Sequence, residues 1–176
     1  MITAPLGHKV RPTSDRVRET VFNILSHRLG DDGWLIDGTQ VLDGFAGTGA
    51  MGLEALSRGA CHVTFMDIDI APCRANIERL REEARCEIVS ADCLRPPPAP
   101  APTGLIFIDP PYESNLVTPT LKFLVSGAWL HQDTPVVVES GFRNGPIPSP
   151  EGLAIRDSRR YGDTQISVYS LTQRGG

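Results

Sequence analysis

Four consecutive residues, Asp109, Pro110, Pro111 and Tyr112, follow an apolar run and have the types that amine chemistry needs. The Asp109 carboxylate and the Pro110 carbonyl can both accept hydrogen bonds from one exocyclic amino group, and the two prolines fix the direction of that carbonyl. With both amine protons held, the nitrogen lone pair points at an electrophile, so catalysis comes mainly from orientation and electrostatics. Tyr112 offers a face on which a flipped-out base can stack. A proline turn that only ends a strand would explain neither the carboxylate nor the aromatic residue.

A glycine-rich turn, DGFAGTGAMG at 43–52, follows another short apolar run and opens a helical pattern. Its GTGAMG part fits the G-x-G-x-x-G dinucleotide fingerprint, with Asp67 lying 20 residues beyond Gly47. A dinucleotide pyrophosphate would sit on the helix N-terminus, where the Asp43 carboxylate would repel it. A carboxylate instead favours a ligand with positive charge, such as the ammonium and sulfonium of S-adenosylmethionine. A glycine-rich turn without any ligand is the alternative.

Acidic residues also follow the next two predicted strands. Asp67 can accept hydrogen bonds from ribose hydroxyls, with Asp69 as a close alternative, and Asp92 can accept one from an adenine amine. Successive strand ends of a parallel sheet lie at one edge, so these acids and Asp109 are expected to share one site. The candidate cofactor contacts are Asp43, Phe45, Gly47, Gly49, Asp67, Ile68, Asp92 and Cys93.

The elements that must position these residues alternate between strand-like and helix-like patterns, which predicts βαβ units around a parallel sheet. The fold class is therefore α/β, with a mostly parallel seven-stranded sheet, helices on both faces and a closing antiparallel hairpin that adds a strand at or near the edge. The run RPPPAPAPT at 95–103 cannot propagate a helix and predicts an extended polyproline connection. Helices are expected over 15–28, 49–58, 70–84 and 116–126, strands over 40–43, 62–67, 86–91, 104–109 and 134–140, and the hairpin from apolar positions near 153–155 and 166–171.

Composition excludes several classes of protein. The 176 residues predict one domain over 1–176, and no apolar stretch approaches the roughly 18 residues of a membrane span. Pro5 and Gly7 interrupt the N-terminus before an apolar core develops, which argues against a signal peptide. Four cysteines and four histidines show no metal-ligand spacing, so we expect reduced thiols, no metal and a cytoplasmic location.

The charge distribution suits a polyanionic partner better than the net charge of −4 does. Residues 1–28, which form most of an N-terminal basic segment and helix over 1–30, carry five basic and two acidic groups. Residues 140–176 carry five basic and three acidic groups, so both ends are positive around an acidic middle. Solvated helix faces or salt bridges such as Asp15–Arg18 are the alternative role for these arginines. The candidate phosphate contacts are Arg11, Arg16, Arg18, Arg159 and Arg160.

Taken together, these motifs resemble the small-subunit ribosomal RNA guanine-N2 methyltransferase family (the RsmD-like enzymes), which are S-adenosylmethionine-dependent and have a Rossmann-like fold. The resemblance implies methyl transfer to the exocyclic N2 amine of one guanine in 16S ribosomal RNA, in a small-subunit assembly particle or in the RNA itself, by a monomer that binds no membrane. It also implies cofactor contacts at Asp43, Gly47, Gly49, Asp67 and Asp92. The target contacts that it implies are Asp109, Pro110 and Tyr112. The matching segments are RPTSDRVRETVFNIL (11–25), VLDGFAGTGAMGLEALSRGA (41–60), FIDPPY (107–112), VVVE (136–139) and RRYGDTQISVY (159–169).

Two departures from the family pattern stand beside this resemblance. A basic, glycine-rich β-hairpin arm usually precedes the RPT motif, whereas ten residues precede Arg11 here, and a helix usually occupies the place of the proline-rich run. Three other functions remain alternatives: a DNA adenine amino-methyltransferase, for which no separate target-recognition domain is apparent; a NAD-dependent oxidoreductase built on GTGAMG; and a non-catalytic RNA-binding factor.

Overall fold

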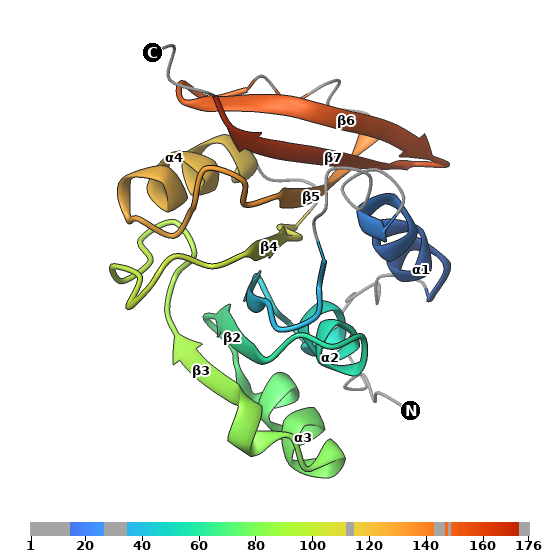
Figure 1. Ribbon diagram of the computed structural model, residues 1–176, viewed down its shortest axis with the longest axis vertical. Helices are drawn as coiled ribbons and strands as arrows, with labels where there is room; N and C mark the ends of the chain where they lie inside the picture. The colour runs from blue at the N-terminus through green and yellow to red at the C-terminus, as the bar shows by residue number, and fades with distance from the viewer. Residues whose placement is uncertain (1–14, 27–34, 112–114, 143–146, 148, 173–176) are drawn as a thin grey trace.

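The computed structural model describes residues 15–26, 35–111, 115–142, 147 and 149–172, with the side chains of residues 15 and 16 outside that description. Its centre is a seven-stranded sheet with the strand order β3-β2-β1-β4-β5-β7-β6 (Figure 1). None of the described helices is long and apolar enough to cross a membrane. The strands are β1 (Gln40–Gly44), β2 (His62–Asp67), β3 (Cys86–Ser90), β4 (Leu105–Ile108), β5 (Val136–Gly141), β6 (Leu153–Tyr161) and β7 (Thr164–Leu171), and the helices are α1 (Asp15–Ile24), α2 (Ala50–Ser57), α3 (Ala71–Leu80) and α4 (Val117–Ser126).

The first five strands are parallel, and their order reverses direction beside β1. The chain builds outward from β1 through β2 to β3, then crosses back to place β4 on the other side of β1 and β5 beyond it. Ligands of open α/β sheets bind at such a switch point, outside the carboxyl ends of the strands. The fold therefore brings the residues that follow β1, β2, β3 and β4 to one edge.

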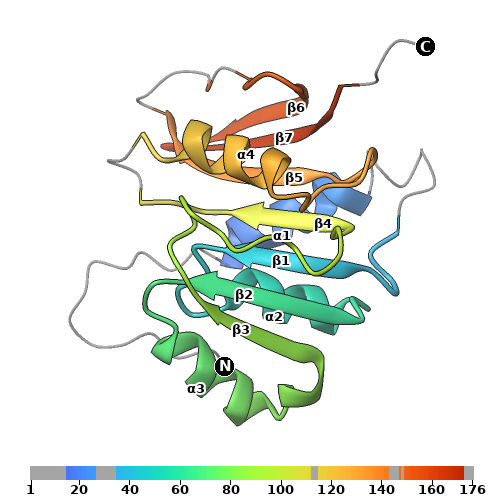
Figure 2. The same ribbon diagram turned by 90° about the vertical axis from the view of Figure 1, so that its left-hand side faces the viewer.

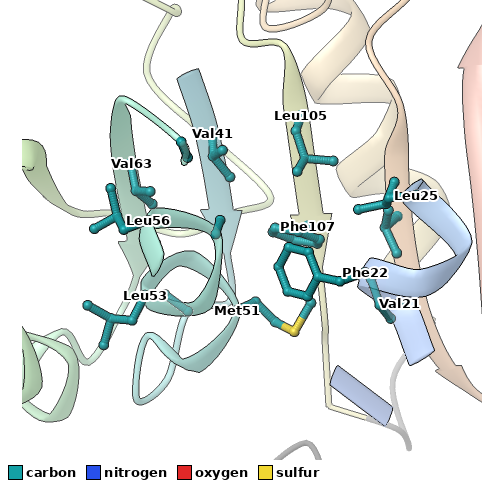
Figure 3. Close-up of a cluster of buried hydrophobic side chains, with 14 of the residues drawn as sticks. Val21, Phe22, Leu25, Val41, Met51, Leu53, Leu56, Val63, Leu105 and Phe107 are labelled. Atoms are coloured by element: carbon teal, nitrogen blue, oxygen red, sulfur yellow. The ribbon is translucent and has the colours of Figure 1, made fainter. Parts of the chain in front are cut away.

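Helices α1, α2 and α3 cover one face of the sheet, because their apolar side chains pack against alternate residues of the strands (Figure 2). Phe22 of α1 meets Phe107 of β4 edge-to-face, with ring centroids 5.6 Å apart. Figure 3 shows this contact, with Met51 of α2 beside the Phe22 ring. The strand that leads into Asp109 is thus packed directly against the N-terminal helix.

Helix α4 and the proline-rich connection cover the opposite face (Figure 2). Residues 95–103 form no helix, as predicted, and they run extended over this face. Trp129 anchors the connection: its Nε1–H donates to the Pro97 carbonyl at 3.0 Å, and its own carbonyl accepts the Thr103 N–H at 2.9 Å. An indole that is 1% exposed therefore stabilises a segment that cannot make helical hydrogen bonds of its own.

The predicted fold class is confirmed, and the two places to note are helix ends. Helix α1 is assigned to Ile24, and residues 27 and 28 of the predicted helix lie outside the described residues. The predicted helix 70–84 ends at Leu80, because Arg81 adopts a left-handed conformation (φ 60°) and a short 3₁₀ turn, Glu83–Arg85, follows. The hairpin adds one strand antiparallel to β5 near the edge, as predicted: β7 pairs with β5, and β6, which pairs with β7, forms the edge.

Candidate active site

Side chains from neighbouring elements hold the glycine turn between β1 and α2 in place by hydrogen bonds to the backbone of the turn. Gly47 has φ +52° and donates its N–H to Asp67 Oδ2 at 2.9 Å. Gly52 must lack a side chain, because a Cβ there would come within 2.7 Å of Val63 Cγ1 and closer still to the Phe65 ring. These glycines let the turn lie close against β2, which leaves its outer side to a ligand.

Asp43 lies at the end of β1, and its carboxylate is 3% exposed. Its Oδ2 accepts the N–H of Gly52, in the first turn of α2, at 2.8 Å. Burial raises the pKa of Asp43 from 3.8 to about 7; the Gly52 bond lowers it and the nearby charge of Asp67 raises it further. The sequence places this acid at the strand end correctly, but its bond to α2 was not foreseen.

Asp67, at the end of β2, uses both carboxylate oxygens to order the loops around it. Oδ2 accepts from Gly47, and Oδ1 accepts the Asp69 N–H at 3.0 Å. Asp69 in turn caps the start of α3 by accepting the Ala71 N–H at 3.2 Å. The structure therefore favours Asp67 over Asp69 as the acid nearest the glycine turn. Ile68 between them is 72% exposed, an unusual state for a large apolar side chain beside buried strands.

Asn76 supports the same turn and was missed by sequence reasoning. Its side chain on α3 is 2% exposed, and its Nδ2 donates to the Thr48 carbonyl at 2.9 Å. The available signal was a polar residue within the apolar stripe formed by Cys73 and Ile77. A buried amide at a core position of a helix usually has a specific hydrogen-bonding role.

The loop after β3 closes the other side of the turn. Asp92 Oδ1 accepts the Leu94 N–H at 2.9 Å, which orders the loop locally, and Cys93 is 4% exposed. The Cys93 Sγ accepts the Phe45 N–H at 3.2 Å, so the loop after β3 is joined to the glycine turn after β1. Burial raises the pKa of Cys93 to about 12, which keeps this thiol neutral. Phe45 itself has φ +58°, a conformation that costs free energy in a residue other than glycine.

Asp109 and Pro110 directly follow the last residue of β4, next to the end of β1. The Asp109 N–H donates to the Gly44 carbonyl at 3.4 Å, so the acid stands directly beside the glycine turn. Pro110 is buried, while Pro111 is exposed at the rim. Tyr112 lies outside the described residues. The structure thus brings together the candidate residues after four strands, as the sequence predicted.

Arg18, a candidate phosphate contact, is largely covered by its neighbours. Its side chain is 17% exposed, and its Nε lies 3.7 Å from Glu54 Oε2 on α2. Arg58 pairs with the same carboxylate at 2.7 Å and lies over the Phe22 ring at 4.5 Å. These contacts hold α1 against α2. Arg11 and the side chain of Arg16 lie outside the described residues.

Arg159 and Arg160 lie near the tip of the β6–β7 hairpin. Because β6 runs parallel to β5, this tip is at the same edge of the sheet as Asp109. Arg159 pairs with Asp157 at 3.1 Å, whereas Arg160 is exposed and its guanidinium carbon lies 3.7 Å from the centroid of the Phe142 ring. Positive charge is therefore placed beside the site on a solvent-facing strand.

The side chains of this site are suited to a nucleoside that carries positive charge. Asp43 is a buried carboxylate whose charge is disfavoured by desolvation, and a cation would stabilise that charge. Asp67 can accept further hydrogen bonds at its remaining lone pairs, and exposed Ile68 can cover an apolar ring. No group of three or more metal-ligating side chains was found among the described residues.

Known proteins are similar to this chain in sequence and in fold. The family model described as "Conserved hypothetical protein 95" matches residues 1–170. Ribosomal RNA small subunit methyltransferase D of Escherichia coli (strain K12) is 32% identical over 177 residues, covering 99% of this chain and 86% of that protein. The protein of the same name from Haemophilus influenzae is 32% identical over 170 residues, covering 91% of this chain and 82% of its own length. The solved structure of Escherichia coli yhhF superposes with a TM-score of 0.78 at 29% identity, covering 97% of this chain and 92% of that one.

Proposed function

We propose that the chain, which belongs to the Conserved hypothetical protein 95 family, is a ribosomal RNA methyltransferase like the relatives named above and methylates the exocyclic N2 amine of one guanine in 16S ribosomal RNA. One observation carries this proposal: Asp109 and Pro110 stand at the end of β4, and the Asp109 N–H donates to the Gly44 carbonyl at the end of β1, beside the glycine turn. The amine-holding motif and the nucleoside-binding turn thus share the switch point of the sheet.

S-adenosylmethionine is the proposed cofactor, and it would supply an electrophilic methyl group attached to a sulfonium. Asp43 would hold its positive charge, and Asp67 would accept hydrogen bonds from its ribose hydroxyls. Asp92, Cys93 and Phe45 would form the wall around its adenine, with exposed Ile68 covering the ring. Asn76 would act indirectly, by fixing the Thr48 carbonyl and with it the glycine turn.

At the target base, the Asp109 carboxylate and the Pro110 carbonyl would each accept one N–H of the guanine N2 amine. Holding both protons turns the nitrogen lone pair out of conjugation with the ring and toward the methyl donor. As the new bond forms, positive charge develops on N2, and the adjacent carboxylate stabilises it. Tyr112 would stack on the base and Pro111 would keep the loop rigid.

The RNA itself would lie along the carboxyl edge of the sheet. Arg159 and Arg160 stand at that edge, where guanidinium groups can contact phosphates. Arg18 is better explained as part of the contact between α1 and α2, because it is half-buried and paired with Glu54. Arg11 and Arg16 remain proposed contacts from the sequence alone.

The two competing enzymes are less consistent with the site. A NAD-dependent oxidoreductase would place a pyrophosphate over the glycine turn, close to the carboxylates of Asp43 and Asp67. A DNA adenine amino-methyltransferase would use the same amine chemistry, but the matched relatives are named for ribosomal RNA.

Mass spectrometry of nucleosides from 16S ribosomal RNA tests the proposal. RNA from cells with the intact gene should contain one more N2-methylguanosine than RNA from cells in which the gene is deleted, and fragment mapping should locate it. An unchanged content of N2-methylguanosine, or a lost methyl group on adenine, would contradict the proposal.

A further inference from the structure

Two polar atoms in the described part of the chain are buried without a hydrogen-bond partner: Ser140 Oγ and Gln165 Oε1. Their residues are 7% and 8% exposed and lie directly opposite each other on β5 and β7. An orphaned buried polar group is destabilising, so natural structures rarely keep one without a use. Two such atoms on neighbouring strands indicate a site that a polar ligand completes.

The pair lies beside the amine-holding residues. The last recorded pair between β4 and β5 joins Ile108 to Val138, so Ser140 stands two residues further along β5, at the level that Pro110 reaches beyond β4. Strand β5 continues beyond the end of β4, still paired with β7 as far as Gly141. The orphaned atoms therefore lie in the part of the sheet that extends past the end of β4, next to Asp109 and Pro110.

The orientation of Gln165 is fixed by a third strand. Its Nε2 donates to Ser158 Oγ of β6 at 2.7 Å, and Ser158 Oγ is 3.0 Å from Ser167 Oγ. Because the amide nitrogen makes this bond, the amide oxygen Oε1 is the atom of the side chain that lacks a hydrogen-bond partner. The amide is thus presented in one direction as a hydrogen-bond acceptor, while the Ser140 hydroxyl can donate.

An aromatic face accompanies the pair. Phe142 follows Ser140 by two residues, just after the end of β5, and its N–H donates to the Asp163 carbonyl at 2.9 Å, which joins it to the turn between β6 and β7. Arg160, which stacks on the Phe142 ring, lies opposite Gln165 on β6, and opposite residues of antiparallel strands share a face. A ring that carries a guanidinium in the free chain is also a surface on which a nucleobase can stack.

We propose that Gln165 and Ser140 read the Watson–Crick edge of the target guanine while Asp109 and Pro110 hold its N2 amine. The inference rests on the proposed function. Beyond the N2 amine, this edge of guanine presents the N1–H donor and the O6 acceptor. Gln165 Oε1 accepts the N1–H, and the Ser140 hydroxyl donates to O6, once the base has taken the place of the Arg160 guanidinium on Phe142.

This arrangement selects guanine by its pattern of donors and acceptors. A purine with a 2-amine but with an unprotonated N1 and no O6 would leave both Gln165 and Ser140 without partners. A site built to hydrogen-bond one pattern rejects an analogue that lacks it far more strongly than an apolar pocket does, because its buried groups stay unpaired. The amine clamp alone would not make this distinction, since the 2-amine is the same in both bases.

A target-site substitution tests the inference. Once the modified guanine has been located, small-subunit RNA is prepared with either guanine or 2-aminopurine at that position, and methyl transfer to each is measured as kcat/KM. The wild-type chain should prefer guanine by at least about 10- to 100-fold. Gln165→Met should remove most of this preference by slowing transfer to guanine, with little effect on 2-aminopurine. Gln165→Glu keeps an acceptor and should keep the preference, and Ser140→Ala should lose part of it.

Ser167→Ala is the matched control, because it removes the Ser158–Ser167 hydrogen bond from the same network but keeps the Gln165–Ser158 bond and both reading groups. It should retain the preference for guanine. An equal loss of transfer to both bases in Gln165→Met and Ser140→Ala, or an undiminished preference, would overturn the inference and leave the proposed function standing. Absence of any transfer to guanine N2 by the wild-type chain would instead overturn the proposed function.

Discussion

The acids of this site differ in what their carboxylates do before any ligand binds. Asp67 has both oxygens bonded to backbone N–H groups, whereas Asp43 has a bond from Gly52 to one oxygen and is almost fully buried. Desolvation therefore dominates at Asp43, and its pKa is raised to about 7. The protonation of Asp43 should therefore respond to the charge of the ligand.

The affinity for S-adenosylhomocysteine, which retains the ammonium, should depend on pH. A cation favours ionised Asp43, so binding below pH 7 must release a proton, and affinity should fall by up to about tenfold for each pH unit below 7. Titration calorimetry from pH 5 to pH 8 measures this. The raised pKa also means that the free chain loses stability as pH rises from 3.8 to about 7, since the folded state retains a proton that the unfolded state has lost.

Asp43→Asn provides the control for that prediction. The amide can still accept the Gly52 N–H but cannot ionise, so the variant should bind weakly and with little dependence on pH. A wild-type affinity that is flat between pH 5 and pH 8, or a variant with the same slope as the wild type, would contradict the role given to this carboxylate.

Residue types and their order predicted which residues gather at one edge of the sheet, but their hydrogen-bond partners could not be read from the sequence. An acid after β1, β2, β3 and β4 follows from the strand pattern and the geometry of parallel sheets. The bond from Asp43 to Gly52 depends on how α2 leaves the turn, and the role of Asn76 depends on how α3 packs over it. Local patterns do not contain those tertiary contacts.

At the level of elements, α1 is held to the sheet by two kinds of contact. Phe22 is 2% exposed and packs edge-to-face on Phe107, two residues before Asp109. Glu54 joins Arg18 and Arg58 across α1 and α2, but its side chain is 28% exposed. Exposed ion pairs contribute little, so apolar packing should dominate.

Two substitutions separate these contributions. Phe22→Ala should lower the free energy of unfolding by about 3–5 kcal/mol, because it leaves a cavity against β4. Glu54→Gln should lower it by less than about 1 kcal/mol. Urea denaturation followed by circular dichroism measures both. A larger loss for Glu54→Gln than for Phe22→Ala would show that the ion pairs, not the core, hold the helix.

The elements themselves were largely predictable, and the exceptions have local causes. The helical pattern of the sequence extends past Arg81. In the structure, the backbone of Arg81 is left-handed, which ends α3, and a 3₁₀ turn follows. The proline-rich run was correctly expected to be extended, because proline lacks the N–H that a helix needs. Its attachment through Trp129 to the end of α4 was not predictable, since the two segments are 32 residues apart.

Across the whole molecule, charge is separated between the site and its rim. The carboxylates gather at the carboxyl edge of the parallel strands, while the edge strand β6 carries Arg156, Arg159 and Arg160. The net charge of −4 hides this separation, which the sequence indicated only as an excess of basic residues near the ends. A polyanion could therefore be held beside a site that itself prefers a cation.

Binding to RNA should weaken when the charge of β6 is removed. The double variant Arg156→Gln with Arg159→Gln should reduce affinity for 16S ribosomal RNA and lower the slope of log K against log salt by about 1–2, as expected for the loss of one or two phosphate contacts. Fluorescence anisotropy at several salt concentrations measures the slope. Arg81→Gln, at the opposite edge of the sheet, should leave it unchanged, and equal effects of both variants would rule out a specific role for β6.

The most direct measurement is methyl transfer by Asp109→Ala compared with wild type, using labelled S-adenosylmethionine and small-subunit particles that lack the modification. The wild-type chain should place label in N2-methylguanosine. Asp109→Ala should transfer at least about 100-fold more slowly, because an acceptor for the developing charge is gone, while calorimetry should still detect binding of S-adenosylhomocysteine. Full transfer by Asp109→Ala would contradict the proposal that this carboxylate holds the guanine amine.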